Sequence, residues 1–398
     1  MQFDQGVGEL QTIGARLDAR QGIGPGFDFL RIFLAVAVVA WHAPVVVHGT
    51  DYWTEGPILR LGSYAILTSF FSLSGFLISG SALRLSLPNF LVNRGLRIMP
   101  ALGVEVILSA LVLGPIFTVL TLGEYFSSKV TIGYFTNLVG LIKYSLPGVF
   151  ETHPTVVVNR SLWTVPHEII CYVIMAGLML FGLLRRKWLV LLTPVAVLLL
   201  SLGLQLVDFN PDGANPLLRQ FFRSFGTDAV RLFVGFLLGI VIYLFRDRVP
   251  YSHVLAGVCA VWCVALSLPA IDNFVLTNVL LGPAVAYLTA YIGVTDIPMP
   301  KLLTKGDYSY GIYLYGWPIQ QVTYYFIPNV TNALVHFVVA LPLIILFAAF
   351  SWHAIEKPIL GTRKRFSFIA RVRLDDAQAS SAVRPPVTGA GLNASKEV

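Results

Sequence analysis

Ten apolar runs, each long enough to cross a bilayer, constrain this chain more than any other feature of its sequence. They fall at about residues 28–47, 62–82, 98–122, 164–184, 188–206, 229–245, 253–271, 275–293, 308–328 and 334–355. About 20 apolar residues in a helix span the hydrocarbon core of a membrane, since each residue adds about 1.5 Å. Because 56% of the 398 residues are hydrophobic and only 12% are charged, the sequence predicts an all-α polytopic membrane protein rather than a soluble one.

Positive charge between the runs predicts their orientation. Arginine and lysine cluster in short loops, which the positive-inside rule assigns to the cytoplasm. The clusters are Arg16 and Arg20; Arg84, Arg94 and Arg97; Arg185, Arg186 and Lys187; Arg246 and Arg248; Lys301 and Lys305; and the stretch 357–373. They share one side if two spans separate Arg97 from Arg185, so we interpret the shorter stretch 131–146, which contains Lys143, as re-entrant or interfacial. Both termini are then cytoplasmic, and Arg219, Arg223 and Arg231 are the main exceptions.

Three segments make up the predicted domain organisation. Residues 1–26 form a polar cytoplasmic lead-in without the apolar core and cleavage site of a signal peptide. The transmembrane domain covers 27–360. Residues 361–398 form a cytoplasmic tail that is first basic and then rich in Ala, Ser, Pro and Gly, a composition typical of disorder.

Net charge and cysteine content exclude some classes of protein. The formal charge is +7, and the basic residues that give rise to it lie beside apolar runs. Membrane topology explains that distribution, so we expect no nucleic-acid partner. Cys171, Cys259 and Cys263 lie within apolar runs and lack the spacing of zinc ligands. The sequence therefore predicts neither a disulfide framework nor a metal site.

The first apolar run contains two polar side chains, Arg31 and His42. Eleven helical steps separate them, which brings both to one face of a helix about 16 Å apart along its axis. If Arg31 lies at a membrane surface, His42 lies near the middle of a core about 30 Å thick. Titratable groups are costly there and indicate a functional site. The alternative is a snorkelling arginine and a core histidine bonded to a neighbouring carbonyl.

The second run and the loop after it carry small residues and then two arginines. Ser72, Ser74 and Gly75 permit close helix packing and hydroxyl bonds between helices. Arg94 and Arg97 are three residues apart and project from one face of a helix. Two guanidinium groups at the cytoplasmic surface suit phosphate binding. The alternative is that they anchor the helix to lipid headgroups.

The fourth run begins with a histidine and a glutamate in place of apolar residues. Pro166 suits the first helical turn, Thr164 could cap it, and Glu168 lies near the positive end of the helix. The charge pattern places this end outside the cytoplasm. A helix cap with no further role is the alternative function of this segment.

The last two runs have ordinary structural explanations. Tyrosines at the start of the ninth run, Tyr310 among them, fit an aromatic belt at the membrane interface. Glu356, Lys357 and Pro358 after the tenth run fit a helix stop.

Taken together, six motifs resemble the membrane acyltransferase-3 family, and they occur in its order over about residues 25–360. They are Arg31 with His42, Phe-Phe-Ser-Leu-Ser-Gly-Phe-Leu-Ile at 70–78, Arg94 with Arg97, Ser-Leu-Trp-Thr-Val-Pro-His-Glu at 161–168, Ser-Tyr-Gly-Ile-Tyr-Leu at 309–314 and Ile-Glu-Lys-Pro at 355–358. The stretches after Trp163 and Tyr315 are most similar to the bacterial O-antigen and exopolysaccharide O-acetyltransferase branch.

The resemblance implies a role for each matched residue. His42 and Arg31 form the catalytic pair, and Glu168 serves the acceptor side. The phosphates of acyl-CoA bind Arg94 and Arg97, and we expect Arg31 to bind them as well. Ser74, Trp163 and Tyr310 bind substrate or shape the site. One departure is Ile169, which stands where the family often has a second acidic residue.

The implied function is acyl transfer from cytoplasmic acyl-CoA, with acetyl-CoA as the expected donor, to a hydroxyl of a cell-surface or exported polysaccharide. His42 would act as a base or as a covalent acyl carrier. The expected partners are acyl-CoA, a carbohydrate acceptor, lipid-linked or free, and membrane lipid, and the expected location is the bacterial cytoplasmic (inner) membrane. The alternatives are a transporter or flippase without bond chemistry, and an acyltransferase acting on a lipid or small metabolite.

Overall fold

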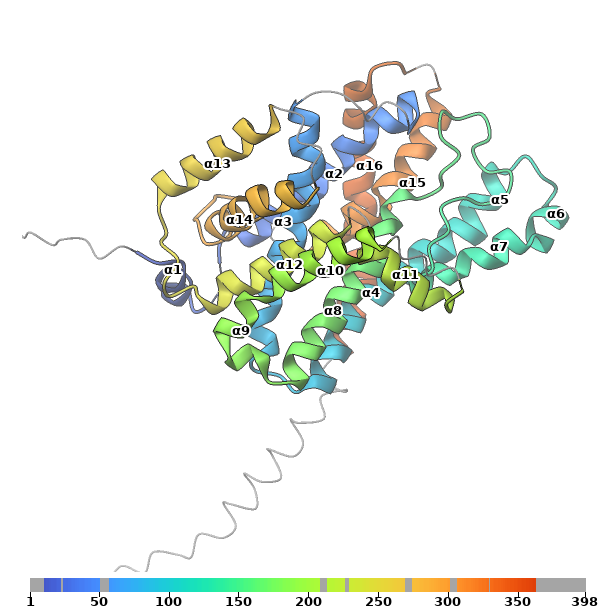
Figure 1. Cartoon of the computed structure of the whole chain (residues 1–398). Helices are drawn as coiled ribbons and strands as arrows, with labels where there is room; N and C mark the ends of the chain where they lie inside the picture. The colour runs from blue at the N-terminus through green and yellow to red at the C-terminus, as the bar shows by residue number, and fades with distance from the viewer. Residues whose placement is uncertain are drawn as a thin grey trace, which may run out of the picture.

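The computed structural model describes residues 11–22, 24–50, 57–207, 213–225, 229–268, 274–300, 306–328 and 330–362. Figure 1 shows helices throughout these ranges. Their only β pairing consists of two isolated bridges, Thr12 with Pro250 and Thr118 with Val149. The predicted all-α class is confirmed.

The ten longest helices within these ranges correspond to the ten apolar runs. They are α2 (Phe27–His48), α3 (Pro57–Ala82), α4 (Leu87–Leu108), α8 (Val165–Leu180), α10 (Thr193–Leu206), α12 (Val230–Leu244), α13 (His253–Ser267), α14 (Phe274–Gly293), α15 (Ser309–Phe326) and α16 (Ala333–Ser351). Shorter helices are α1 (Ile13–Ala19), α5 (Gly114–Phe117), α6 (Leu122–Ser127), α7 (Lys129–Tyr134), α9 (Lys187–Leu191), α11 (Pro216–Phe225) and α17 (Lys357–Gly361). Turns of 3₁₀ or π type are η2 (Ser109–Leu113), η3 (Phe135–Val139), η4 (Arg160–Thr164), η5 (Leu183–Arg185) and η7 (Trp352–Glu356).

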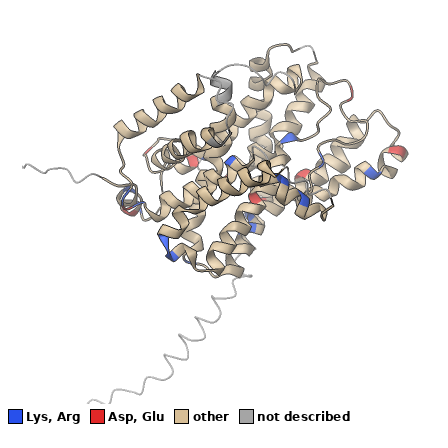
Figure 2. Ribbon diagram, in the orientation of Figure 1, with Lys and Arg blue, Asp and Glu red and all other residues tan. Residues whose placement is uncertain are grey.

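Within the described ranges, seven helical stretches are long and apolar enough to cross a membrane. An eighth is added if α11 and α12, which meet at 73°, form one broken span. The helix α13 is apolar but shorter, and α15 carries several polar side chains. These apolar helices are those of an integral membrane protein, and the expected number of about ten is consistent with them. Figure 2 shows that charged residues are sparse along the long helices.

The third span differs from its predicted bounds. It was expected at 98–122, whereas the helical stretch runs from Leu87 to Phe117. Ser86 stands at the N-cap and Pro88 suits the first turn, so the helix starts well before the apolar run does. Arg94 and Arg97 therefore lie two to three turns inside α4, and their assignment to a loop was wrong.

The stretch 131–146 does not form a spanning helix. It contains the end of α7, the short turn η3 and an irregular segment without helix. The Asn137 side chain holds that segment, because its amide donates to the Lys143 carbonyl and its oxygen accepts from the Lys143 backbone amide. Figure 1 shows α5, α6 and α7 together at one side of the long helices, in agreement with the expectation that this stretch does not span.

The lead-in contains a docked helix. Thr12 caps α1, Ile13 and Leu17 are buried, and the Ile13 amide donates to the carbonyl of Val249 at 2.9 Å. Residues 1–10, which belong to the predicted lead-in, lie outside the described residues. So does the predicted tail after residue 362.

Close packing of α3 against α12 fixes the centre of the molecule. A Cβ added at Gly75 would lie 2.0 Å from the carbonyl oxygen of Phe236, and one added at Gly239 would lie 2.0 Å from that of Ser72. The small residues predicted to permit close approach therefore do so. Next to this pair, α2 packs against α15 and α16.

Candidate functional site

A cavity of about 160 Å³ lies between α2, α3, α4, α8 and α15. We call it the arginine cavity, because three guanidinium groups line it. Six of the predicted site residues contribute to its wall: Arg31, Ser74, Arg94, Arg97, Glu168 and Tyr310. Apolar side chains such as Phe70 and Leu77 complete it. The predicted placement of Arg94 and Arg97 on one helix face is thus confirmed.

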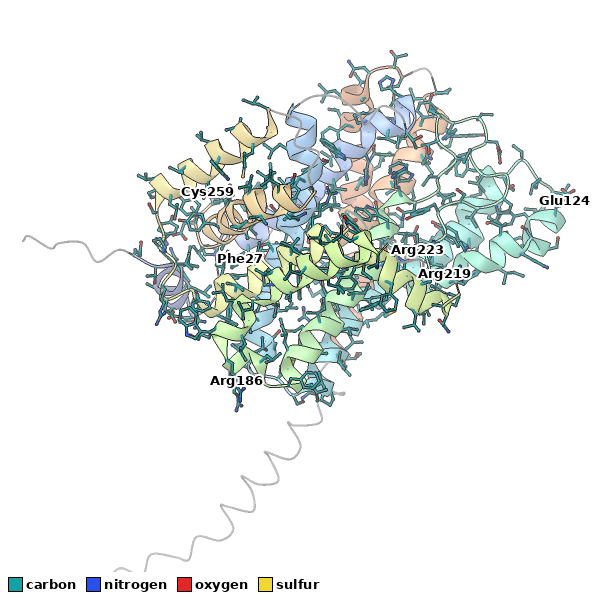
Figure 3. The ribbon with its side chains drawn as sticks, in the orientation of Figure 1. Phe27, Glu124, Arg186, Arg219, Arg223 and Cys259 are labelled. Atoms are coloured by element: carbon teal, nitrogen blue, oxygen red, sulfur yellow. The ribbon has the colours of Figure 1, made fainter. Side chains whose placement is uncertain are left out.

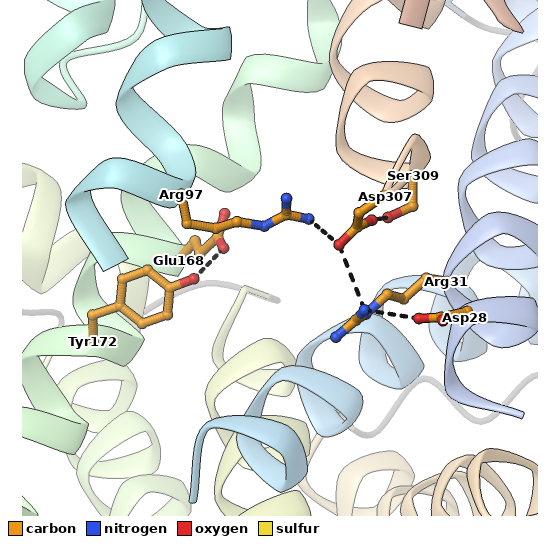
Figure 4. Close-up of polar contacts among 7 residues, drawn as sticks. All are labelled: Asp28, Arg31, Arg97, Glu168, Tyr172, Asp307 and Ser309. Carbon is orange, nitrogen blue, oxygen red and sulfur yellow. Dashed lines mark hydrogen bonds and ion pairs between the residues drawn. The ribbon is translucent and has the colours of Figure 1, made fainter. Parts of the chain in front are cut away.

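An aspartate joins two of the arginines across helices (Figure 4). Arg97 Nη2 lies 2.7 Å from Asp307 Oδ2, and Arg31 Nη1 lies 3.5 Å from the same oxygen. The Ser309 hydroxyl donates to Oδ1 at 2.7 Å. Burial acts to raise the pKa of Asp307, but the Arg97 and Arg31 guanidiniums and the Ser309 hydrogen bonds outweigh it and hold that pKa below its ordinary value.

The third arginine differs from the other two. Arg94 forms no ion pair within the described ranges; its guanidinium carbon lies 5.8 Å from the Phe90 ring centroid and 6.0 Å from that of Tyr172. Its Nε atom is buried without a hydrogen-bond partner among the described residues. Arg94 is therefore the guanidinium with the least competition for an incoming anion.

Glu168 lines the arginine cavity, in the first turn of α8 after Pro166. Its carboxylate accepts a hydrogen bond from the Tyr172 hydroxyl. The separation expected from the sequence, with the arginines on one side and Glu168 on the other, is not found. The expected Thr164 cap is also absent, since the Thr164 side chain makes no capping bond and instead lies 2.6 Å from the Tyr313 hydroxyl. The cause is the extra 3₁₀ turn η4, which precedes α8.

His42 lines a second, neighbouring cavity of about 80 Å³, which we call the histidine cavity. Its wall includes Trp41, Trp163 and the arginines Arg160 and Arg231. The imidazole packs edge-on against Trp317, with ring centroids 4.9 Å apart. Arg231, one of the exceptions to the charge pattern, therefore lines a cavity. The other two exceptions, Arg219 and Arg223, lie on α11 (Figure 3).

The two cavities adjoin each other. Leu67 and Tyr313 line both, so these side chains lie between them. The helix α2 also contributes to both cavities, because Arg31 lines one and His42, three turns later, lines the other. Of the predicted site residues, Trp163 alone joins His42 in the histidine cavity.

Sequence reasoning assigned no role to Asp307 or Arg160 and took Glu356 for a helix stop. Glu356 is buried in the π turn η7 and accepts a hydrogen bond from Ser351. A carboxylate at the edge of an apolar run was a usable signal for Asp307 and Glu356, because such a group needs a partner. The described part of the chain contains no group of His, Cys, Asp and Glu side chains suited to a metal ion.

Comparisons with known proteins give a consistent result. A family model described as an acyltransferase domain, of the acyltransferase-3 type, matches residues 25–353. An O-acetyl transferase of Shigella phage Sf6 is 28% identical over 302 residues, which cover 74% of this chain and 84% of the relative. Nodulation protein 10 of Rhizobium leguminosarum bv. viciae is 29% identical over 395 residues, which cover 87% of this chain and 95% of that protein. No solved structure matches the chain.

Proposed function

Because the chain belongs to the acyltransferase-3 family and is therefore a membrane acyltransferase of groups other than aminoacyl groups, we propose that it moves an acyl group from acyl-CoA to a sugar hydroxyl. Acetyl-CoA is the proposed donor, since the phage relative is named an O-acetyl transferase. The proposed acceptor is a cell-surface or exported polysaccharide. The proposed location is the bacterial cytoplasmic membrane, with both chain termini on the cytoplasmic side, where acyl-CoA is made.

The adjoining cavities carry this proposal. An acyl-CoA molecule has phosphates at one end and a thioester at the other, joined by a thin arm. The arginine cavity offers guanidinium groups to the phosphates, and charge-assisted bonds of this kind are among the strongest that a protein makes. The neighbouring histidine cavity offers a base to the reacting end. Arg94 is the first ligand for phosphate in this scheme, because Asp307 already occupies Arg97 and Arg31.

The chemical step takes place at His42. Its neutral imidazole removes the proton from the acceptor hydroxyl while the hydroxyl oxygen attacks the thioester carbonyl carbon. The carbon–sulfur bond breaks, and the departing CoA sulfur takes the proton back from the imidazolium. If His42 instead carries the acyl group, the imidazole nitrogen attacks first and the hydroxyl attacks second. Either route needs both substrates within reach of one ring.

The remaining predicted residues shape the two cavities. Glu168, Ser74 and Tyr310 line the donor side, where Glu168 and Asp307 balance part of the arginine charge. Trp163 lines the side of the histidine and offers an aromatic face to a sugar ring. Glu168 is therefore proposed to act on the donor, in place of the acceptor role that the resemblance implied. Arg31, on the helix of His42, also faces the donor.

His42→Ala tests the reaction. The variant should lower acetylation of the surface polysaccharide, measured by mass spectrometry, by at least about a hundredfold, the usual contribution of a general base. His336→Ala is the matched control, because His336 is another buried histidine of the helix bundle and lines neither cavity. Full acetylation by the His42 variant would overturn the catalytic assignment.

Purified protein in liposomes distinguishes an acyltransferase from a transporter. Purified protein in liposomes should release CoA from acetyl-CoA supplied on the side of the arginine cavity. A transporter would move a solute down its gradient and leave the thioester intact. Intact acetyl-CoA together with solute movement would therefore refute acyl transfer.

Donor binding has its own test. Arg94→Gln should weaken acetyl-CoA binding by about ten- to a hundredfold, the value of a hydrogen bond to a charged group, and Arg94→Lys should restore part of it. Arg84→Gln is the control, because Arg84 is exposed and lies outside both cavities. Equal affinities in all three variants would leave Arg94 without a part in donor binding.

A further inference from the structure

The wall between the two cavities contains a tyrosine whose position is fixed by the turn before α8. Tyr313, on α15, lines both the arginine cavity and the histidine cavity. Its hydroxyl donates to the Ser161 carbonyl at 3.1 Å and lies 2.6 Å from the Thr164 hydroxyl. Its ring meets that of Phe70 at 6.0 Å between centroids, nearly edge-on. Leu67 is the other side chain shared by the two cavities.

The anchor of this tyrosine is itself part of both cavities. Ser161 and Thr164 belong to the turn η4. From the same turn, Trp163 faces the histidine cavity and Thr164 faces the arginine cavity. A molecule that enters the histidine cavity and contacts Trp163 therefore presses on the turn that holds the Tyr313 hydroxyl.

The position of the wall matters because of the chemistry on either side. The proposed function puts the CoA phosphates in one cavity and the imidazole in the other, so the thioester reaches His42 only if the side chains between the two cavities move aside. Water competes with a sugar hydroxyl for an activated acyl group, and sites that handle such groups exclude it until the acceptor is in place. The Tyr313 hydroxyl is bonded to η4, a turn that also lines the histidine cavity. This arrangement lets Tyr313 exclude water until an acceptor binds there.

We propose that Tyr313 is a positioning residue that separates the acyl donor from His42. When the acceptor fills the histidine cavity, it displaces the turn η4, and Tyr313 moves with that turn so that the donor reaches His42. It thereby sets the ratio of acyl transfer to hydrolysis. This inference rests on the proposed function, since it assumes an acyl-CoA donor and His42 as the base.

The test uses the full-length protein in liposomes with acetyl-CoA alone, and cells for transfer to the surface polysaccharide. Tyr313→Ala should raise CoA release in the absence of acceptor by about tenfold, because the water barrier is lost, and should lower polysaccharide acetylation. Tyr313→Phe and Thr164→Val, which remove only the hydroxyl contact, should raise the release by a smaller factor. They keep the test valid if Tyr313→Ala does not fold.

A second variant separates a specific effect from general loosening. Adding His42→Ala to Tyr313→Phe should abolish the extra CoA release, because the same imidazole would activate the water. Tyr324→Ala is the matched control, since Tyr324 is on the same helix and lines neither cavity, and its ratio of transfer to hydrolysis should equal that of the wild type.

The outcomes distinguish this inference from the function on which it rests. A wild-type protein that neither releases CoA nor acetylates the polysaccharide would refute the proposed function. A wild-type protein that does both, with folded Tyr313 and Thr164 variants of unchanged ratio, would refute only the role of Tyr313. Extra CoA release that persists without His42 would also refute it.

Discussion

Replacing Asp307 by asparagine removes the charge that joins two helices of the candidate site, and its effect on stability can be worked out from the structure. Asp307 Oδ2 lies 2.7 Å from Arg97 on α4 and 3.5 Å from Arg31 on α2. Asparagine has the same shape and keeps one oxygen acceptor. The substitution therefore removes the ion pairs while disturbing the packing little.

The expected cost lies between those of a surface ion pair and a buried one. The exposed fractions of the Asp307, Arg97 and Arg31 side chains are 24%, 23% and 29%, so water screens the charges only in part. Exposed pairs contribute about 0–1 kcal/mol, and breaking a buried pair costs about 3–5 kcal/mol. Because the asparagine side chain would still accept one hydrogen bond, we expect a loss of about 1–3 kcal/mol from the free energy of unfolding.

Asp28 provides a matched control on the same arginine. Its carboxylate lies 3.1 Å from Arg31, three residues along α2, but its side chain is 68% exposed. A pair of this kind contributes at most about 0.5 kcal/mol. Asp28→Asn should therefore denature at nearly the wild-type temperature, whereas Asp307→Asn should denature at a clearly lower one.

The pH dependence of the stabilisation shows whether the charge of Asp307 causes it. The folded state holds the pKa of Asp307 below its ordinary value, so the unfolded chain takes up the proton first as the pH falls. The stabilisation is present above the unfolded pKa of about 3.9 and is lost as the pH falls through the lower folded pKa. Thermal denaturation of the wild type and of Asp307→Asn in detergent, from pH 7 downward, should show the two midpoints converging below about pH 4.

Two results would refute this reasoning. Equal midpoints at neutral pH would mean that the ion pairs add nothing to stability. A difference that stays constant as the pH falls through the Asp307 titration would mean that Asp307→Asn acts through packing rather than charge.

The remaining predictions concern packing and topology. Gly75→Ala should lower the yield of folded protein in size-exclusion chromatography, because its Cβ would meet the Phe236 carbonyl at 2.0 Å and overpacking costs about 1–3 kcal/mol or more. Gly103→Ala is the control and should match the wild type, because its Cβ meets nothing within 4 Å. Single cysteines at the exposed positions Arg84 and Glu151, in a background without the native cysteines, should react with an impermeant reagent from opposite sides of the membrane. Labelling of both from one side would mean that a further segment between α4 and Glu151 crosses the membrane.

The helices and their approximate bounds followed from the sequence because they depend on local patterns. About 20 apolar residues form a spanning helix whatever surrounds them. The same holds for faces of one helix, so Arg94 and Arg97 were predicted correctly to project together. Small residues at Gly75 and Ser72 predicted the close packing of α3, although not the partner helix α12.

Contacts between residues far apart in the sequence determined the candidate site. Arg97 lies inside a long apolar helix, against the charge pattern, because Asp307, 210 residues later in the chain, provides a counter-charge and a cavity faces it. No local pattern near Arg97 contains that information. Likewise, the sequence placed Arg31 and His42 on one helix face, but only the packing of α3 and α15 across that face puts Leu67 and Tyr313 between their cavities. Helical periodicity is a property of neighbouring residues, whereas a cavity is what several helices leave unfilled, and this is why the tertiary structure alone determined the divided site.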